Sequence, residues 1–242
     1  MRKDMGYTIE SRVSYSEVGV DKCLKLGKIV DYLQDTSTFH SEDLGRGLEY
    51  LIERNMAWLM TSWQIVINRR PAHGEKIKVT TWPYDFRNCY GDRNFTIHTE
   101  DGELLVYANS LWVLVNTETG HPVRRMPEEI SSAYTLEEKI DMEYAPRKIR
   151  IKGDHEVLPS FKIQKYQIDS NNHVNNSQYV YMAECCVPAD LRYSEIRVEY
   201  RNQAVLDDAV IPKIYRQDGR FVVSLDGTEG QVFALIEFIV TE

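Results

Sequence analysis

The sequence predicts an α+β protein in which one structural unit occurs twice, each copy a central helix wrapped by an antiparallel sheet. Two observations lead to this prediction. Most apolar residues alternate with polar ones, as in half-buried strands, and each half contains one helical stretch. The order of these segments, one strand, one helix and then further strands, also repeats along the 242 residues.

The first half starts with an alternating strand over Tyr7–Tyr15. A helix with Asp21 near its start follows, because apolar residues recur at the spacing i, i+3, i+4, i+7. These residues are Leu26, Ile29, Val30 and Leu33. Alternation then predicts strands around Leu59–Ile67, Lys76–Trp82, Asn94–Thr99 and Leu104–Val115. Asp101 and Gly102 form a hairpin signal between the last two.

The second half repeats this order. A strand over Phe161–Tyr166 precedes a helix that runs from Ser177 to Cys186 and is stopped by Pro188. Alternation then predicts strands near Glu195–Arg201, Ala209–Tyr215, Phe221–Leu225 and Gln231–Val240.

We therefore expect a first repeat over residues 1–128, a linker over 129–154 and a second repeat over 155–242. The linker is charged and lacks strand alternation, so some helix is expected there. The repeats align without gaps over one stretch, and the alternation places the same apolar face inward in both copies. Trp63, Ile65, Ile67, Gly74, Glu75 and Ile77 match Ile196, Val198, Tyr200, Asp207, Asp208 and Val210.

Composition excludes several classes of protein. The net charge of −8 argues against a general nucleic-acid binder. No apolar run approaches the roughly 18 residues of a membrane span, and residues 1–6 contain no secretory apolar core. The four cysteines form no C-x-x-C pattern and the six histidines have no ligand spacing, so we expect reduced thiols, no metal and no cofactor. A cytoplasmic protein is the simplest interpretation.

The most informative segment is the polar turn in the second half, between the strand at Phe161–Tyr166 and the helix that starts at Ser177. Asp169, Asn171 and His173 follow one another at spacing two, directly before the helix. One such residue is a common helix cap, but a cap needs only one. A carboxylate, an amide and an imidazole beside a helix N-terminus, whose N–H groups favour negative charge, are suited to hydrolysing an activated acyl group.

This turn resembles the catalytic turn of the acyl-acyl carrier protein (acyl-ACP) thioesterases. Residues Ser110–Glu129 resemble the strand and turn that close the first half in that family, and Val198–Arg201 resemble the strand that faces the catalytic turn. The resemblance implies a tandem hot-dog fold and release of free fatty acid from acyl-ACP, which ends fatty-acid synthesis. It implies acyl carrier protein as the partner, with a homodimer left open.

Asp169, Asn171 and His173 are the catalytic candidates that the resemblance implies. An imidazole that titrates near neutral pH is a natural base for water. Asn171 would orient that water or contact the oxyanion. Asp169 would fix the imidazole tautomer, or would itself attack and form an anhydride. Backbone N–H groups at Val174–Asn176 would form the oxyanion hole. The supporting candidates are Gln203, Asn175, Tyr179 and Arg201.

The sequence departs from the family at Gln203 and Ala204, where many members carry a Glu-Cys pair with assigned catalytic roles. A cysteine nucleophile at this position is excluded. Glutamine can hydrogen-bond but cannot accept a proton as a carboxylate does. Two alternatives to the acyl-ACP thioesterase therefore stay open: an acyl-CoA thioesterase with the same site, and a non-catalytic acyl-binding module.

The two halves differ in a way that suggests a division of labour. The matching turn of the first half, Tyr15–Asp21, has neither His nor Asn, while all four Trp lie in the first half, together with an extra stretch over Gly47–Trp58. We expect the first half to hold the acyl chain, and the candidate binding residues are Met56, Trp58, Met60 and Trp63. Docking an acidic carrier would need a basic patch. The candidates are Arg69-Arg70, Arg87 with Arg93, Arg124-Arg125, and Arg147-Lys148 with Arg150 and Lys152.

Overall fold

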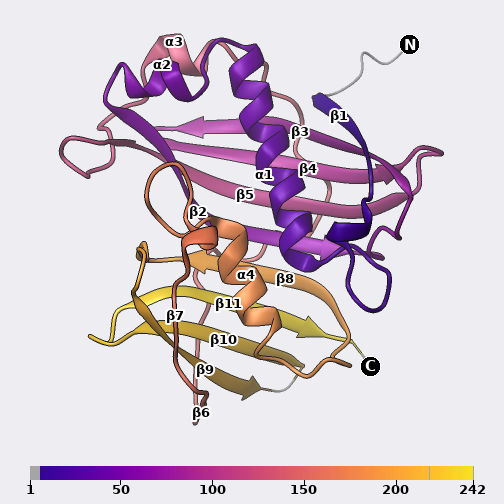
Figure 1. The fold of residues 1–242 in the computed structure, drawn as a ribbon. Coiled ribbons are helices and arrows are strands. Elements are labelled where there is room, and N and C mark those ends of the chain that lie inside the picture. The colour runs from indigo at the N-terminus through magenta and orange to yellow at the C-terminus, as the bar shows by residue number, and fades with distance from the viewer. Residues whose placement is uncertain (1–5, 218, 242) are drawn as a thin grey trace. The chain divides into compact units, whose positions relative to one another are not determined.

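The computed structural model describes residues 6–217 and 219–241, and the expected absence of a secretory core falls mostly on residues outside this range. The chain forms two compact units that do not strictly follow chain order (Figure 1). Unit 1 contains the N-terminal segment up to Lys25 together with Asp31–Thr61 and Asn68–Tyr144. Unit 2 contains Leu26–Val30, Ser62–Ile67 and the chain from Ala145 onward.

Unit 1 is an antiparallel sheet in the order β1-β3-β4-β5, with helix α1 on one face (Figure 1). Its elements are β1 (Tyr7–Arg12), a 3-10 helix (Tyr15–Glu17), α1 (Leu26–Asp43), α2 (Leu48–Ile52), β2 (Met56–Ile67), β3 (Lys76–Arg87), β4 (Tyr90–Thr99), β5 (Leu104–Asn116) and α3 (Glu128–Ser131). The first residues of α1 and the second half of β2 count with unit 2.

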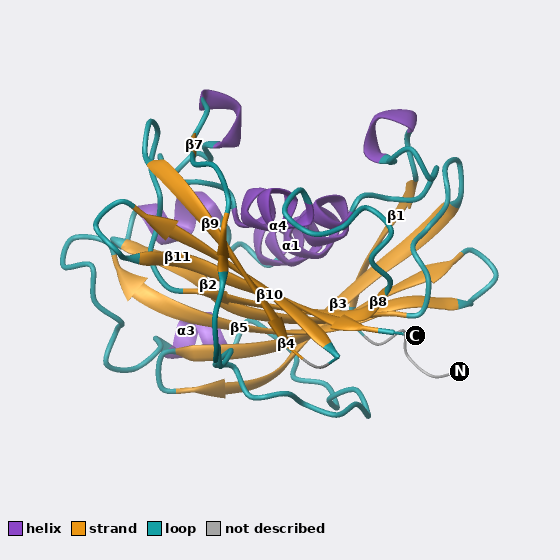
Figure 2. Ribbon diagram, turned by 90° about the horizontal axis from the view of Figure 1, so that it is seen from below, coloured by secondary structure: helices purple, strands orange, loops and turns teal. Residues whose placement is uncertain are grey.

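Unit 2 repeats this architecture, with strand order β2-β8-β11-β10-β9-β6 and helix α4 on one face (Figure 2). Its elements are β6 (Glu156–Val157), β7 (Phe161–Lys162), a 3-10 helix (Lys165–Gln167), α4 (Asn176–Glu184), β8 (Tyr193–Tyr200), β9 (Ala209–Gln217), β10 (Arg220–Gly227) and β11 (Val232–Val240). The predicted α+β class, with a helix against an antiparallel sheet in each half, is confirmed.

The predicted apolar stripe of α1 is confirmed, since Leu26, Ile29, Val30 and Leu33 are fully buried. The helix continues ten residues beyond Leu33, where the apolar period stops. Thr36 and Ser37 can lie on the buried face because each hydroxyl donates to a backbone carbonyl of the preceding turn, at 2.6 and 2.7 Å. A search for periodic apolar residues could not detect this part of the buried helix face, because its residues are polar.

Both predicted first strands are shorter than expected. The strand at Tyr7–Tyr15 ends at Arg12, and that at Phe161–Tyr166 ends at Lys162; a 3-10 turn follows each. In both turns a side chain accepts a hydrogen bond from a backbone N–H three residues earlier, from Ser14 to Glu17 (2.8 Å) and from Gln164 to Gln167 (2.7 Å). These local bonds replace the ladder and end the strand.

The ungapped alignment of the two repeats is confirmed by backbone geometry. Gly74 and its counterpart Asp207 both have a positive φ, 80° and 69°. The residues that follow them, Glu75 and Asp208, accept equivalent hydrogen bonds of 2.9 Å from the N–H groups of Val13 and Ile163.

A segment that we call the strap, residues 145–152, lies across one face of the sheet of unit 2. Its Ile149 side chain packs with Val222 and Leu235, and its Ile149 N–H donates to Glu199 at 2.7 Å. The guanidiniums of Arg197 and Arg220, which both pair with the fully buried Glu237, donate to strap carbonyls. The strap, which is the later part of the predicted linker, is therefore ordered by the sheet it crosses, and the short α3 lies at the start of that linker.

None of the helices in the described part of the chain has the length and apolar character that a bilayer span requires.

Candidate active site

The polar turn predicted from the sequence is a closed loop between the 3-10 helix and α4. Two backbone bonds close it: Asn175 N–H donates to Gln167 at 2.9 Å, and Asp169 N–H donates to His173 at 2.8 Å. Asn172 takes a left-handed conformation (φ 62°), which asparagine tolerates better than most residues. The loop therefore fixes the three catalytic candidates through its backbone.

Asp169 stabilises this turn with its side chain. Its Oδ1 accepts the N–H groups of Asn171 (2.8 Å) and His173 (3.2 Å). The expectation that the carboxylate bonds the imidazole and fixes its tautomer is not met in this geometry, because it bonds the backbone of His173.

His173 has the most distinctive environment in the turn. The residue is half-buried, and its Nδ1 atom is buried with no hydrogen-bond partner among the described residues. Leaving a buried polar atom unpaired costs about 1–3 kcal/mol, so such atoms call for a functional explanation. The protein leaves this nitrogen without a bond, and a water or substrate group would have to enter the turn to pair with it.

The segment after β8 meets the turn through Ala204. The carbonyl of this fully buried residue accepts Val174 N–H at 2.9 Å, which brings the neighbouring Gln203 to the same place in the fold. Asn171 and Gln203 are both exposed. The segment after β8 therefore faces the turn, as the sequence predicted for this part of the chain. The contact is made by the backbone of Ala204, which the sequence analysis did not identify.

Three supporting candidates make structural contacts. The Tyr179 hydroxyl accepts Ala204 N–H at 2.9 Å, and burial raises the pKa of Tyr179 to about 12, so it stays a neutral hydroxyl. Asn175 caps α4 by accepting Ser177 N–H at 3.0 Å. Arg201 pairs with Glu199 at 3.0 Å, the carboxylate that also accepts from the strap.

Two of the three backbone N–H groups expected to form the oxyanion hole are already used in other hydrogen bonds. Val174 and Asn175 N–H groups already donate to Ala204 and Gln167. They cannot point at a substrate oxygen without breaking the loop, so an oxyanion contact must come from another donor.

The matching turn of unit 1 keeps the same backbone bonds without the same side chains. Gly19 N–H donates to Cys23 at 2.9 Å, as Asp169 does to His173, and Leu24 N–H donates to Pro71 at 2.8 Å, as Val174 does to Ala204. Asp21, the counterpart of Asn171, forms an ion pair with Arg70, the counterpart of Gln203. One turn per chain therefore carries the polar equipment.

The predicted acyl-binding residues are divided between the units. Met56 and Trp58 belong to one apolar cluster of unit 1, with Leu51 of α2 and Ile130 of α3. Met60 is buried on the same strand in unit 1. Trp63 is buried in unit 2, opposite Val198 in the register of β2 and β8.

A comparison with known proteins now places the chain. The model of a family described as the acyl-ACP thioesterase N-terminal domain matches residues 5–134, more than half of the chain. The chain belongs to the acyl-ACP thioesterase family.

Several plant relatives in this family align with most of the chain. A chloroplastic acyl-[acyl-carrier-protein] hydrolase of Cuphea viscosissima is 26% identical over 215 residues, covering 80% of this chain and 51% of the relative. A dodecanoyl-[acyl-carrier-protein] hydrolase of Cinnamomum camphora is 25% identical over 214 residues, covering 80% and 55%. The chain thus spans about half the length of these curated relatives.

Solved structures of acyl-ACP thioesterases have the same fold. That of Bacteroides thetaiotaomicron superimposes with a TM-score of 0.88 at 22% identity, covering 97% of both chains. The 12:0-ACP thioesterase from Umbellularia californica gives 0.82 at 22% identity, covering 98% of both chains. The tandem hot-dog architecture expected from the sequence is confirmed.

Proposed function

We propose that this protein hydrolyses fatty acyl-ACP to free fatty acid and carrier protein, in the cytoplasm. Family membership supports the reaction class, and the relatives named above are acyl-ACP hydrolases. The observation that carries the proposal is the buried, unpartnered Nδ1 of His173 in a turn whose other buried polar groups are bonded.

The proposed reaction begins with water beside His173. The imidazole takes a proton from the water as its oxygen attacks the thioester carbonyl carbon. The tetrahedral oxyanion then collapses, the C–S bond breaks, and the sulfur of the carrier's thiol takes the proton back from the imidazolium. Asn171, exposed at the same turn, orients the water or donates to the oxyanion.

The geometry supports the water route over an anhydride at Asp169. One carboxylate oxygen already accepts two backbone N–H groups, which stabilise its negative charge and weaken it as a nucleophile. Moving the carboxylate to attack would also release the N–H groups of Asn171 and His173.

The structure narrows the candidate docking surfaces for an acidic carrier. Arg69 pairs with Glu75 and Glu103, and Arg70 pairs with Asp21. Arg87 pairs with Asp85 and Asp92, while Arg93 is buried. Of the candidate cations, those that are exposed and have no carboxylate partner among the described residues are Arg124-Arg125 and, on the strap, Arg147, Lys148, Arg150 and Lys152. We propose that the carrier uses one of these two groups, with the acyl chain in the first repeat.

An acyl-ACP and acyl-CoA panel tests the proposal, with free acids identified by mass spectrometry. We expect release from acyl-ACP, and His173→Ala should lower kcat by roughly 10²–10⁴ with little effect on KM. Faster release from acyl-CoA would favour the alternative carrier, and binding without release would favour the non-catalytic module. Light scattering, which measures the molar mass in solution, tests whether the protein forms a homodimer. An unchanged rate in His173→Ala would overturn the assignment of the base.

A further inference from the structure

The proposed reaction needs hydrogen-bond donors that the backbone of the turn at Asp169–His173 does not supply. Negative charge develops on the thioester oxygen as water attacks, and fixed donors stabilise it. The N–H groups of Val174 and Asn175 are already bonded to other carbonyls. The side-chain amide of Asn171 is exposed and bonds no described residue, so it is one available donor. A second donor has to come from a residue beside the turn.

Unit 1 shows where a side chain at the position of Gln203 can reach. Its counterpart there, Arg70, folds over the matching turn. Arg70 Nη1 donates to the Leu24 carbonyl at 3.3 Å, and Nη2 pairs with Asp21. These two partners stand on either side of the residue that corresponds to His173. A side chain at this position therefore passes close to that residue.

The backbone that carries Gln203 is joined to its turn in the same way in unit 2. Val174 N–H donates to Ala204 at 2.9 Å, as Leu24 N–H donates to Pro71 at 2.8 Å. Glutamine is two bonds shorter than arginine, so it cannot close on the turn as the arginine of unit 1 does. The Gln203 side chain is exposed and bonds no described residue. Two unbonded amides therefore replace the ion pair of unit 1, and a small acceptor group can enter between them.

The type of residue at position 203 decides what such a group meets. An amide donates through its NH2 group over the whole physiological pH range, whereas a carboxylate only accepts. Many members of the family carry Glu at the position of Gln203, and its charge would repel an oxyanion. The exchange of Glu for Gln therefore changes this position from a proton acceptor to a hydrogen-bond donor.

We propose that Gln203 is a catalytic residue and that its side-chain amide forms the oxyanion hole together with Asn171. As the water oxygen bonds to the carbonyl carbon, the π electron pair of the C=O group moves onto its oxygen, where both amides stabilise it. When the C–S bond breaks, this pair re-forms the C=O group and the sulfur takes the proton held by His173. Neither amide gains or loses a proton. This role rests on the proposed hydrolysis.

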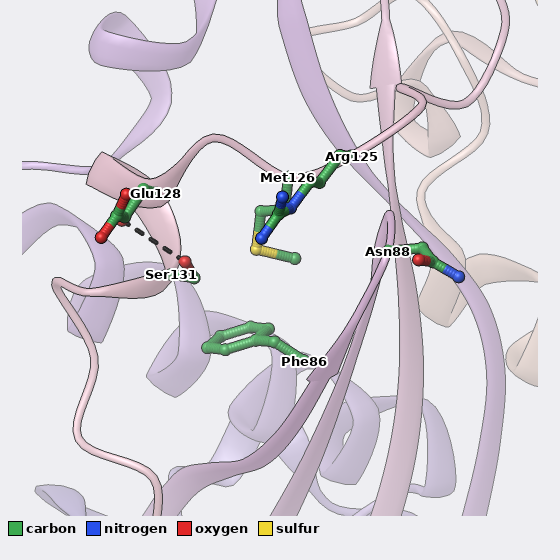
Figure 3. Close-up of a pocket in the computed structure, with 6 residues that line it drawn as sticks. All are labelled: Phe86, Asn88, Arg125, Met126, Glu128 and Ser131. Carbon is green, nitrogen blue, oxygen red and sulfur yellow. Dashed lines mark hydrogen bonds between the residues drawn. The ribbon is translucent and has the colours of Figure 1, made fainter.

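The two amides are distinct from the pocket of unit 1 shown in Figure 3, with which they share no residue. That pocket is lined by Phe86, Asn88, Arg125, Met126, Glu128 and Ser131, all of unit 1. Substitution of Gln203 therefore leaves the walls of the pocket unchanged.

Steady-state kinetics with acyl-ACP test the role of Gln203. Gln203→Met removes the amide at nearly constant shape, and kcat should fall roughly 10²–10³-fold with little change in KM. Gln203→Glu should lose at least as much, because a carboxylate cannot donate and its charge opposes the oxyanion. Arg70→Met, the control, makes a change to the same residue at the matching position of unit 1 and should leave kcat unchanged.

Binding of a transition-state analogue tests the same role without turnover. A long-chain alkyl trifluoromethyl ketone forms a hydrate that resembles the tetrahedral intermediate, whereas the methyl ketone of the same chain does not. Wild type should bind the fluorinated ketone about 10²-fold more tightly in isothermal titration calorimetry. Gln203→Met should remove most of this preference and leave the affinity for the methyl ketone unchanged.

Three results would overturn the proposal. A faster Gln203→Glu enzyme would show that the position needs a base. Equal losses of kcat in Gln203→Met and Arg70→Met would indicate loosened loops in general. A preference for the fluorinated ketone that survives Gln203→Met would place the oxyanion contact elsewhere. If wild type released no acid from any thioester, the proposed hydrolysis would fail, while the two ketones would still decide whether Gln203 binds an oxyanion.

Discussion

At the scale of single residues, Asp169 and His40 show how hydrogen bonds assign roles that residue type alone leaves open. A carboxylate beside a histidine suggests a catalytic dyad, yet Asp169 bonds the backbone of the turn. A half-buried histidine suggests a second reactive group, yet His40 accepts from a buried arginine: Arg93 Nη2 lies 2.6 Å from His40 Nδ1. Each role leads to a prediction.

Asp169→Asn should keep the turn closed, because the amide Oδ1 can still accept both backbone N–H groups. If His173 activates water, turnover falls but remains measurable, and no covalent adduct forms. If Asp169 were the nucleophile, turnover would vanish. Single-turnover assays with intact-protein mass spectrometry distinguish the two outcomes, and an acyl adduct on the wild-type chain that Asp169→Asn lacks would contradict our mechanism.

His40 should make the stability of the protein sensitive to mild acid. Arginine only donates, so Nδ1 must accept and the neutral imidazole is required. Burial and the charge of Arg93 lower the pKa of His40 to about 4. The unfolded chain binds a proton near pH 6.5, so the stability due to neutral His40 is complete above that pH and is lost as pH falls toward 4.

The urea midpoint of wild type should therefore fall more between pH 7 and pH 5 than that of His40→Gln. The glutamine amide can accept from Arg93 but does not titrate. Asp43 and Tyr134 face the same histidine and are unchanged in both proteins, which makes the pair a matched comparison. Parallel pH curves for the two proteins would rule out His40 as the source.

At the scale of elements, one hydrogen bond joins α4 to the segment after β8. A comparison of the two units shows that its donor and its acceptor occur together. Ala204 has an N–H group and Tyr179 accepts it. At the matching positions of unit 1, Pro71 has no N–H group and Ile29 has no hydroxyl. The bond is present where both partners exist and absent where neither does.

Tyr179→Phe should therefore leave the buried Ala204 N–H without an acceptor and cost about 1–3 kcal/mol of unfolding free energy. The segment carrying Gln203 should also loosen, so kcat should fall while KM changes little. Urea denaturation and steady-state kinetics measure the two effects. The double variant Tyr179→Phe, Ala204→Pro removes both partners, as in unit 1, and should recover part of the stability; equal stability of the single and double variants would contradict the linkage.

At the scale of the whole molecule, the net charge of −8 means that an acidic carrier can be attracted only to a local cluster of cations. Attraction between a basic surface and an acidic carrier is screened as salt rises, since the Debye length is about 10 Å at 0.1 M. We expect kcat/KM for acyl-ACP to fall with ionic strength, and charge reversal at Arg124-Arg125 or on the strap to lower it.

Lys76→Glu is the matched control for each single reversal within these groups, because it makes the same change in charge at a cation already paired with Glu100. A rate that is independent of salt, or an equal loss in the control, would remove both candidate docking surfaces.

The repeated order of elements and the polar turn at Asp169–His173 could be predicted because both depend on local sequence patterns. These patterns are apolar–polar alternation, the helical period and a dense run of polar residues. The sequence did not predict the 3-10 turns, the polar end of α1 or the role of Asp169. These depend on which backbone N–H each side chain meets, as with Ser14 and Gln164, and residue spacing does not contain that information. Ordering of the strap likewise depends on carbonyls that face Arg197 and Arg220.

The vestigial turn of unit 1 has an evolutionary consequence. Descent from a duplicated gene leaves two copies of one loop, and a copy relieved of chemistry is free to drift within what folding allows. In unit 1, Gly19 and Cys23 stand in place of Asp169 and His173, and the Asp21–Arg70 ion pair stands in place of Asn171 and Gln203. The backbone bonds that close the loop are the same in both units. The loop therefore closes without a histidine, and the unit 1 copy is a natural starting point for building a second reactive centre into the same chain.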